Sequence, residues 1–319
     1  MKITRNQLEN QQIWIYAIAL LIGGAVGLLS PGAGSSLDAA ISPLIAILMY
    51  GMFTQIPFLK LREALSNLRF MMALLIANFI AVPVIVWVLI TPFPLAPPVL
   101  LGVCLVLLTP CIDYVIVFTQ LGKGNEKLML ASTPVLFVVQ MLLLPVYLWL
   151  FIGGNMAGIV RVGPFLEAFL FLIVVPLIMA LLTQIWAGRK TAGARFLDWT
   201  AWLPVPFMAF VLIVVVASQI GKVYSDLDAI VRVIPIYVLF LVISPIISRA
   251  IAAMFKLDTG EGRALIFSAG TRNSLVVLPL ALALPGDWAR LAAAVIVTQT
   301  IVELVGELVY IKVVPRLMK

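Results

Sequence analysis

Apolar residues along this chain gather in long runs, separated by short segments that hold most of the charges. Each run is about 20 residues long, the length a helix needs to cross the hydrocarbon core of a bilayer. The period-2 alternation of a membrane β-barrel is absent, and lipid offers no partner for free backbone groups. The pattern therefore predicts an all-α polytopic membrane protein with ten transmembrane helices, at about residues 13–29, 38–57, 70–91, 98–121, 128–151, 164–187, 200–221, 231–254, 264–284 and 291–314.

Composition and charge support this interpretation. Hydrophobic residues make up 63% of the chain and charged residues only 11%, whereas a soluble domain has about 25% charged residues. The first apolar run is too long for a typical signal peptide and lacks a small-x-small cleavage site, so we expect it to remain as a span. The net charge of +7 comes from basic residues in short loops, which favours the lipid bilayer over nucleic acid as the partner.

The distribution of basic residues predicts the orientation. Sixteen Lys and Arg residues fall in loops on one side of the predicted spans, and four fall on the other side. Because cytoplasmic loops carry the excess of positive charge, both termini are expected in the cytoplasm, as in a multi-pass protein of a bacterial inner membrane.

Two of the predicted spans are interrupted at corresponding places. The fourth span breaks at Thr109-Pro110-Cys111, and the ninth breaks at Gly270-Thr271-Arg272-Asn273, about half the chain further on. Broken helices in corresponding spans are the sequence feature that best indicates a transporter's binding site. We expect two inverted five-helix repeats, residues 1–155 and 156–319, in which the broken helices 4 and 9 cross.

Four charged residues lie at membrane depth, where an ionisable group usually faces a cavity or a partner. Asp113 and Arg272 lie on the two broken spans. They form a salt bridge, or one of them titrates or meets substrate, and both hold if the bridge forms in one conformation only. Glu303 and Glu307 are one turn apart in the last span. Glu303 is the candidate for proton uptake, while Glu307 either takes part in coupling or lies at a cavity edge within reach of water or Lys312.

Polar and thiol side chains surround the two breaks. Cys111 directly follows Pro110 and is either a substrate ligand or a small apolar residue, whereas Cys104 lies in an unbroken run and is interpreted as packing. Thr109 and Asn273 are further candidates for the substrate site. The chain has no histidine, which excludes His-based metal sites and His proton relays.

These residues resemble a known group, the arsenite permease family within the bile-acid/sodium symporter superfamily. The resemblance covers nearly the whole chain, and its most specific stretch is Pro110-Cys111-Ile112 through Leu121, Gly122 and Gly124, then Gln140 and Pro145-Val146-Tyr147. It implies ten spans, with a core of helices 3–5 and 8–10 moving against a panel of helices 1, 2, 6 and 7. It also implies that the essential pair is Cys111 and Glu303.

The sequence departs from both branches of that superfamily. Where the bile-acid branch has a glutamate and a glutamine that help hold sodium, this chain has Ser268 and Arg272. A guanidinium there should repel sodium, so no sodium site of that kind is expected. Asp113 and Arg272 also depart from the arsenite permease pattern, which leaves open an anionic substrate attracted to Arg272.

The leading functional hypothesis is export of arsenite, and of antimonite, from the cytoplasm by proton antiport with alternating access. Cys111 would be the thiol ligand, with Thr109, Arg272, Asn273 and Glu303 at the substrate site. Asp113, Arg272, Glu303 and Glu307 would serve coupling or gating. The alternative is a sodium-coupled symporter of bile acids or other small organic anions. An enzyme is disfavoured because no catalytic constellation is visible, and no cofactor is expected.

Overall fold

The computed structural model describes residues 7–8, 11–29, 38–58, 67–112, 114–153, 167, 170–223 and 227–319, and the regular elements in these ranges are all helical. Three shorter apolar helices are Trp14–Leu29, Pro43–Gln55 and Pro97–Leu107. By length and composition, six further helices could cross a membrane: Leu68–Ile90, Glu126–Ile152, Leu170–Ala187, Thr191–Ser218, Ile230–Met254 and Asp287–Leu317. The predicted all-α, multi-pass membrane architecture is confirmed, whereas the count of ten spans stays a prediction.

The chain packs as two compact units. The first unit combines Met1–Ile56, Arg161–Leu227 and Leu282–Arg290. The second unit combines Pro57–Val160, Asp228–Ala281 and Leu291–Lys319. Each unit is therefore assembled from segments that lie far apart in the sequence.

In the first unit, helix α14 packs against both α2 and α4, and α4 also packs against α12. Gly23 allows the close approach of α2 to α14, because a Cβ at that position would lie 2.8 Å from the carbonyl oxygen of Ile213. The helices of this unit are α2 (Gln12–Leu29), α4 (Asp38–Gln55), η4 (Leu170–Val174), α12 (Val175–Ala187), α13 (Thr191–Thr200) and α14 (Pro204–Val223).

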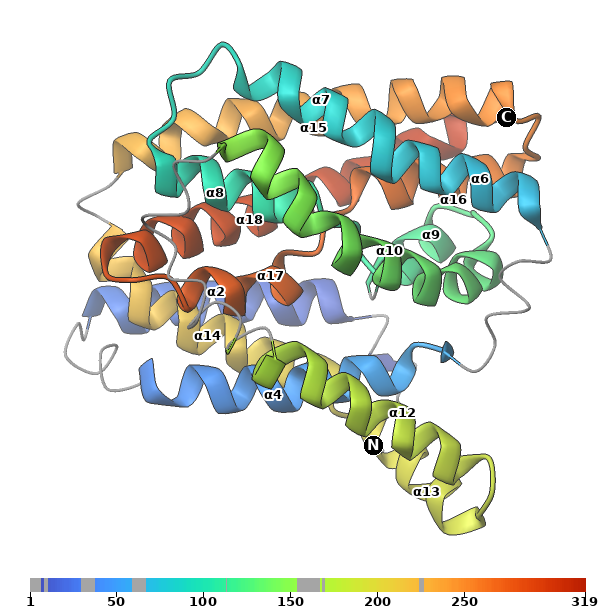
Figure 1. The fold of residues 1–319 in the computed structure, drawn as a ribbon, viewed down its shortest axis with the longest axis horizontal. Helices are drawn as coiled ribbons and strands as arrows, with labels where there is room; N and C mark the ends of the chain where they lie inside the picture. The colour runs from blue at the N-terminus through green and yellow to red at the C-terminus, as the bar shows by residue number, and fades with distance from the viewer. Residues whose placement is uncertain are drawn as a thin grey trace. The chain divides into compact units, whose positions relative to one another are not determined.

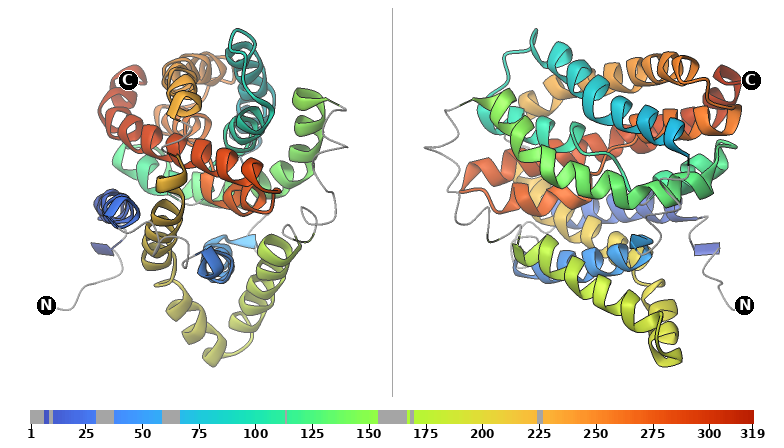
Figure 2. Two further views of the ribbon diagram at one scale, coloured as in Figure 1. Left: turned by 90° about the vertical axis from the view of Figure 1, so that its left-hand side faces the viewer. Right: turned by 45° about the vertical axis from the view of Figure 1, so that its right-hand side comes forward.

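Helix α13 is an element that the hydrophobic pattern did not predict, since it lies between the expected spans 164–187 and 200–221. It folds back on α12 as an antiparallel hairpin, which Figure 1 shows and Figure 2 repeats from two further sides. The rings of Trp186, Phe196 and Trp199 follow one another with centroid separations of 5.9 Å. The charges of Arg195 and Asp198 between these rings hide the short helix from a hydropathy pattern.

The second unit contains both broken helices and the candidate site. Its first elements are α6 (Leu68–Ile76), the π-helical turn η2 (Ala77–Ala81), α7 (Val82–Ile90), α8 (Pro97–Leu107), α9 (Val115–Leu121) and α10 (Glu126–Ile152). Its later elements are α15 (Leu227–Met254), α16 (Thr259–Gly270), α17 (Ser274–Leu282) and most of α18 (Asp287–Leu317).

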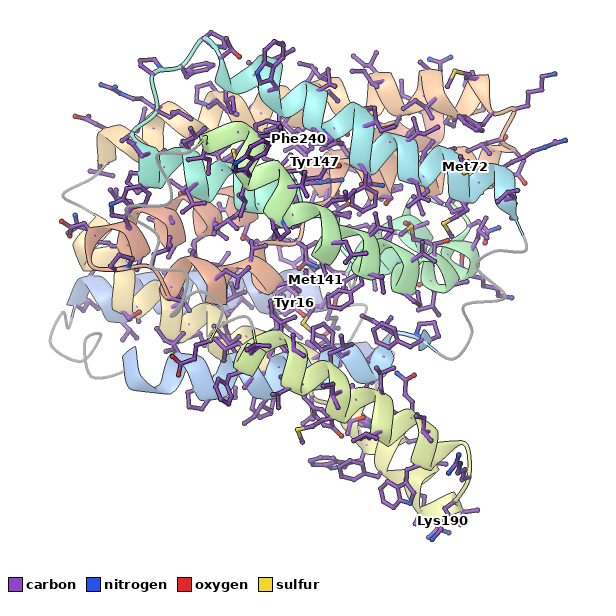
Figure 3. The ribbon with its side chains drawn as sticks, in the orientation of Figure 1. Tyr16, Met72, Met141, Tyr147, Lys190 and Phe240 are labelled. Carbon is purple, nitrogen blue, oxygen red and sulfur yellow. The ribbon has the colours of Figure 1, made fainter. Side chains whose placement is uncertain are left out.

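Two prolines in these helices leave backbone carbonyl groups without a helical N–H donor, and tyrosine hydroxyls donate to these carbonyls instead. A proline lacks an N–H and frees the carbonyl of the residue four positions earlier. Pro83 thus frees the carbonyl of Phe79, which accepts a hydrogen bond of 2.5 Å from the hydroxyl of Tyr147, marked on α10 in Figure 3. In the later segments Pro245 frees the carbonyl of Leu241, which accepts from the hydroxyl of Tyr310. The second contact repeats the first at an offset of 162 or 163 residues (83 to 245, 79 to 241, 147 to 310).

Candidate functional site

The two helix breaks have the same local construction. Helix α8 ends at Leu107 before Pro110, and α16 ends at Gly270. A threonine follows each end and bonds back to its own last turn: Thr109 Oγ1 donates to Leu105 O at 2.9 Å, and Thr271 Oγ1 donates to Phe267 O at 2.6 Å. These hydroxyls add hydrogen bonds to carbonyl groups in the last turn of each helix, and the Phe267 carbonyl also accepts the backbone N–H of Thr271. Both breaks fall at the positions that proline and glycine indicate in the sequence.

The broken segments meet as a short antiparallel backbone pairing between Pro110 and Arg272. Two hydrogen bonds hold it: Cys111 N to Thr271 O at 3.1 Å, and Asn273 N to Thr109 O at 2.9 Å. Thr109, Cys111, Thr271, Arg272 and Asn273 are all fully buried. The pairing satisfies backbone groups that have no helical partner, which a protein in a membrane requires at this depth.

Cys111 lies within this pairing, at the point where neither half of the broken helix continues. Cys104 lies inside α8, and both cysteines are buried thiols. The different placement agrees with the prediction that only Cys111 belongs to the break.

Arg272 carries a fully buried guanidinium group. Its Nη2 donates to Asn78 Oδ1 at 2.9 Å and to Ser268 O at 2.6 Å, and Nη1 donates to Leu107 O at 3.4 Å. The ring of Phe240 faces the guanidinium carbon, with 5.5 Å from that carbon to the ring centroid. These partners of the cation in the described part of the chain are neutral: oxygen dipoles and the π face of an aromatic ring.

Asn78 reaches the guanidinium from the π-helical turn η2, which precedes Pro83. Its Nδ2 donates to Ser268 Oγ at 3.0 Å and to Leu74 O at 3.1 Å, which fixes the amide with Oδ1 toward Arg272. Single π-helical turns often occur at functional sites. Asn78 was only one of many polar span residues in the sequence, and the nearby proline is the signal that distinguishes it.

Asp113, which the sequence places near Arg272, lies outside the described residues. A salt bridge between the two residues therefore stays a prediction.

Glu303, on α18, is buried and accepts three hydrogen bonds. Its Oε2 accepts from Arg272 N at 2.8 Å and from Gln299 Nε2 at 2.5 Å, and its Oε1 accepts from the Tyr114 hydroxyl at 2.7 Å. The same hydroxyl lies 2.9 Å from Arg272 O. Glu303 therefore hydrogen-bonds to a residue beside each break, Tyr114 after the first and Arg272 at the second. The sequence analysis did not predict Tyr114 as a site residue, although its position three residues after Cys111 places it next to the first break.

Glu307 is fully buried, in contrast to the expected position at a cavity edge within reach of water or Lys312. Its Oε1 lies 2.9 Å from Thr271 Oγ1, the hydroxyl that also contacts Phe267 O and has one hydrogen for the two acceptors. Its Oε2 is buried and has no hydrogen-bond partner in the described part of the chain. The physical reason for the difference is that α18 turns both glutamates toward the crossing, where the broken helices cover them.

Further buried polar atoms near the helix breaks and on α10 lack partners among the described residues. Asn273 Oδ1 accepts from Val276 N at 3.2 Å and caps α17, but Asn273 Nδ2 has no partner. Ser274 Oγ and both polar atoms of the Gln140 amide are likewise buried without a partner. Such groups are uncommon in folded proteins and call for an explanation.

The sequence was compared with known proteins. Residues 42–226 match the Sodium Bile acid symporter family, which is more than half of the chain. No curated protein matches the chain. Members of this family are membrane transporters rather than enzymes, and they act on small anions or ions. The apolar helices are those expected of a membrane transporter. Because the family match covers more than half of the chain, the chain belongs to the Sodium Bile acid symporter family.

Proposed function

We propose that this protein exports arsenite, and antimonite, from the cytoplasm by proton antiport. The observation that supports this most strongly is that the backbone N–H of the thiol-bearing residue Cys111 and the carboxylate of Glu303 bond opposite ends of one peptide group. Thr271 O accepts from Cys111 N, and Arg272 N, in the same peptide group, donates to Glu303 Oε2. Because hydrogen bonds through a peptide group polarise one another, a proton on Glu303 weakens one bond and alters the other.

The hydroxyl of Tyr114 supplies a second link to the proton. A tyrosine has one hydrogen to donate, yet this hydroxyl contacts two acceptors, Glu303 Oε1 and Arg272 O. When Glu303 is ionised, its charge attracts that hydrogen. When Glu303 is protonated, it donates to Tyr114, and the tyrosine hydrogen turns to the Arg272 carbonyl. Loading a proton thus tightens the contact between Tyr114 and the second break, which is a means of coupling protonation to the crossing.

The thiol fits the substrate. Trivalent arsenic is thiophilic, and a thiol can replace one hydroxyl of arsenous acid: a sulfur–arsenic bond forms, an arsenic–oxygen bond breaks, and the thiol hydrogen leaves with the hydroxyl as water. One sulfur from Cys111 permits reversal, whereas three thiolates would hold the ion too tightly for transport. Thr109, Asn273 and Arg272 would complete the site with oxygen and nitrogen groups.

The same proposal includes independence of sodium. The Arg272 guanidinium already bonds the oxygens of Asn78 and Ser268, and its charge opposes a second cation there. The second candidate is sodium-coupled symport of a small organic anion, which the family match favours and to which the charge of Arg272 is suited.

We further propose alternating access by two inverted repeats, residues 1–155 and 156–319, with helices 3–5 and 8–10 as the core and helices 1, 2, 6 and 7 as the panel. The matching tyrosine contacts of Phe79 and Leu241 support the repeat. Asp113 and Glu307 would assist gating. The excess of basic residues in one set of loops supports a bacterial inner-membrane protein with both termini in the cytoplasm.

Uptake of arsenite into everted membrane vesicles with an imposed proton gradient tests the proposal. Wild-type protein should accumulate arsenite with or without sodium, and Cys111→Ser should abolish the uptake. Cys104→Ser is the matched control, because it removes the other buried thiol without touching the break, and it should retain uptake. Uptake by Cys111→Ser at the wild-type rate would reject the thiol role, and strict dependence on sodium would favour the anion symporter.

A further inference from the structure

Gln140 is a buried amide that makes no hydrogen bond in the described structure. It is 1% exposed, and neither Oε1 nor Nε2 has a partner. A buried polar group without a partner destabilises the fold, whereas an apolar side chain of similar shape would not. A glutamine at this position therefore indicates that its amide binds something other than the protein itself.

The helix that carries Gln140 packs beside the first broken helix. Helix α10 packs against both α9 and α8, the two halves of the broken helix. Gln140 lies near the midpoint of α10, and Figure 3 marks the neighbouring Met141 in the middle part of this helix. The residues that connect α8 to α9 include Cys111.

The repeated contacts of the second unit give an independent argument. The offset of 163 residues that relates Tyr147 to Tyr310 also relates Gln140 to Glu303, and the offset of 162 that relates Pro83 to Pro245 also relates Pro110 to Arg272. Glu303 accepts a hydrogen bond from the backbone N–H of Arg272. The residue at the corresponding place in the first break is Pro110, which has no N–H to donate. Gln140 thus occupies the counterpart of the glutamate position, and the N–H that would serve its Oε1 there is absent, which fits an Oε1 without a partner in the described part of the chain.

We propose that Gln140 is a substrate-binding residue that bonds the hydroxyl groups of a neutral oxyacid held by Cys111. This inference rests on the proposed export of arsenite. An arsenic atom bonded to one sulfur keeps two hydroxyl groups, each of which donates and accepts. Gln140 Oε1 accepts from one hydroxyl and Nε2 donates to it or to the other, and Asn273 Nδ2 provides a further donor. A neutral amide suits a neutral ligand, because a charged side chain at this depth would need a counter-charge.

The test uses the purified full-length protein in detergent, with thermal unfolding measured at increasing arsenite concentrations. Gln140→Leu removes the unpartnered amide at similar volume. It should raise the unfolding temperature of the arsenite-free protein by a few degrees. It should also weaken arsenite binding about tenfold, the effect of losing one or two hydrogen bonds to the ligand, seen as a smaller arsenite-dependent rise in unfolding temperature.

Gln184→Leu is the matched control. Gln184 is also a buried glutamine in a helix, but its Nε2 bonds the carbonyl oxygens at the end of α4, at 2.7 Å in the case of Ile56. Its replacement should lower the unfolding temperature. A similar fall in Gln140→Leu would show a structural role and overturn the inference, as would unchanged arsenite affinity in Gln140→Leu. If arsenite stabilises neither the wild type nor any variant, the proposed function itself fails, and the inference with it.

Discussion

Tyr147→Phe tests the idea that the tyrosine hydroxyl compensates for a proline in the neighbouring helix. The substitution removes only the hydroxyl that bonds the Phe79 carbonyl, four residues before Pro83. A typical hydrogen bond contributes about 1 kcal/mol, and stranding a buried carbonyl costs about 1–3 kcal/mol. Since the interior offers this carbonyl no water, we expect the free energy of unfolding to fall by about 1–3 kcal/mol.

A double-mutant cycle separates this effect from the loss of a buried hydroxyl in general. In Pro83→Ala, the alanine N–H can bond the Phe79 carbonyl along the helix, so the Tyr147 hydroxyl becomes redundant. Tyr147→Phe should then cost little in that background, with a coupling energy of about 1–2 kcal/mol between the two positions. The assay is thermal unfolding in detergent, followed by the fluorescence of the seven tryptophans. An equal loss in both backgrounds would refute the reasoning.

Three further substitutions have defined outcomes. Gly193→Ala should destabilise the α12–α13 hairpin by about 1–3 kcal/mol in thermal unfolding, because the new Cβ would lie 2.7 Å from the backbone carbon of Trp186. Gly188→Ala in the same hairpin should be neutral or stabilising, since its Cβ would meet nothing closer than 3.6 Å. Glu303→Gln should keep the fold, because an amide oxygen can still accept from Arg272 N, but vesicle uptake of arsenite should no longer respond to the proton gradient. Retained coupling would exclude Glu303 as the proton carrier.

The two breaks were predictable because proline and glycine act on their own backbone. Pro110 ends a helix whatever surrounds it, and Gly270 followed by polar residues weakens one in the same local way. The long apolar runs were predictable for a similar reason, since the hydrocarbon core demands a minimum length.

The partners across the site were not predictable, because they depend on contacts between residues far apart in the chain. Tyr114 and Glu303 are 189 positions apart, and nothing in their local sequence pairs them. Glu307 was expected near water because it follows Glu303 toward the predicted cytoplasmic end, yet it is buried beneath Thr271. Depth along a helix can be counted from the sequence, whereas the face covered by a neighbouring helix cannot.

The two helix breaks share their backbone contacts but differ in their side chains, which suggests that they have different roles. The hydroxyls of Thr109 and Thr271 each bond the carbonyl four residues earlier. In the backbone pairing, each segment donates one N–H to a carbonyl of the other. The side chains differ. Cys111 and the proposed Gln140 give the first break a thiol and a neutral amide, whereas Arg272 and Glu303 give the second a guanidinium and a carboxylate. In the proposed function, the first set would bind the neutral, thiophilic ligand, and the second would bind the proton. Because the peptide group between Thr271 and Arg272 contacts both Cys111 and Glu303, we infer that exchange between ligand and proton acts through the backbone of the crossing itself.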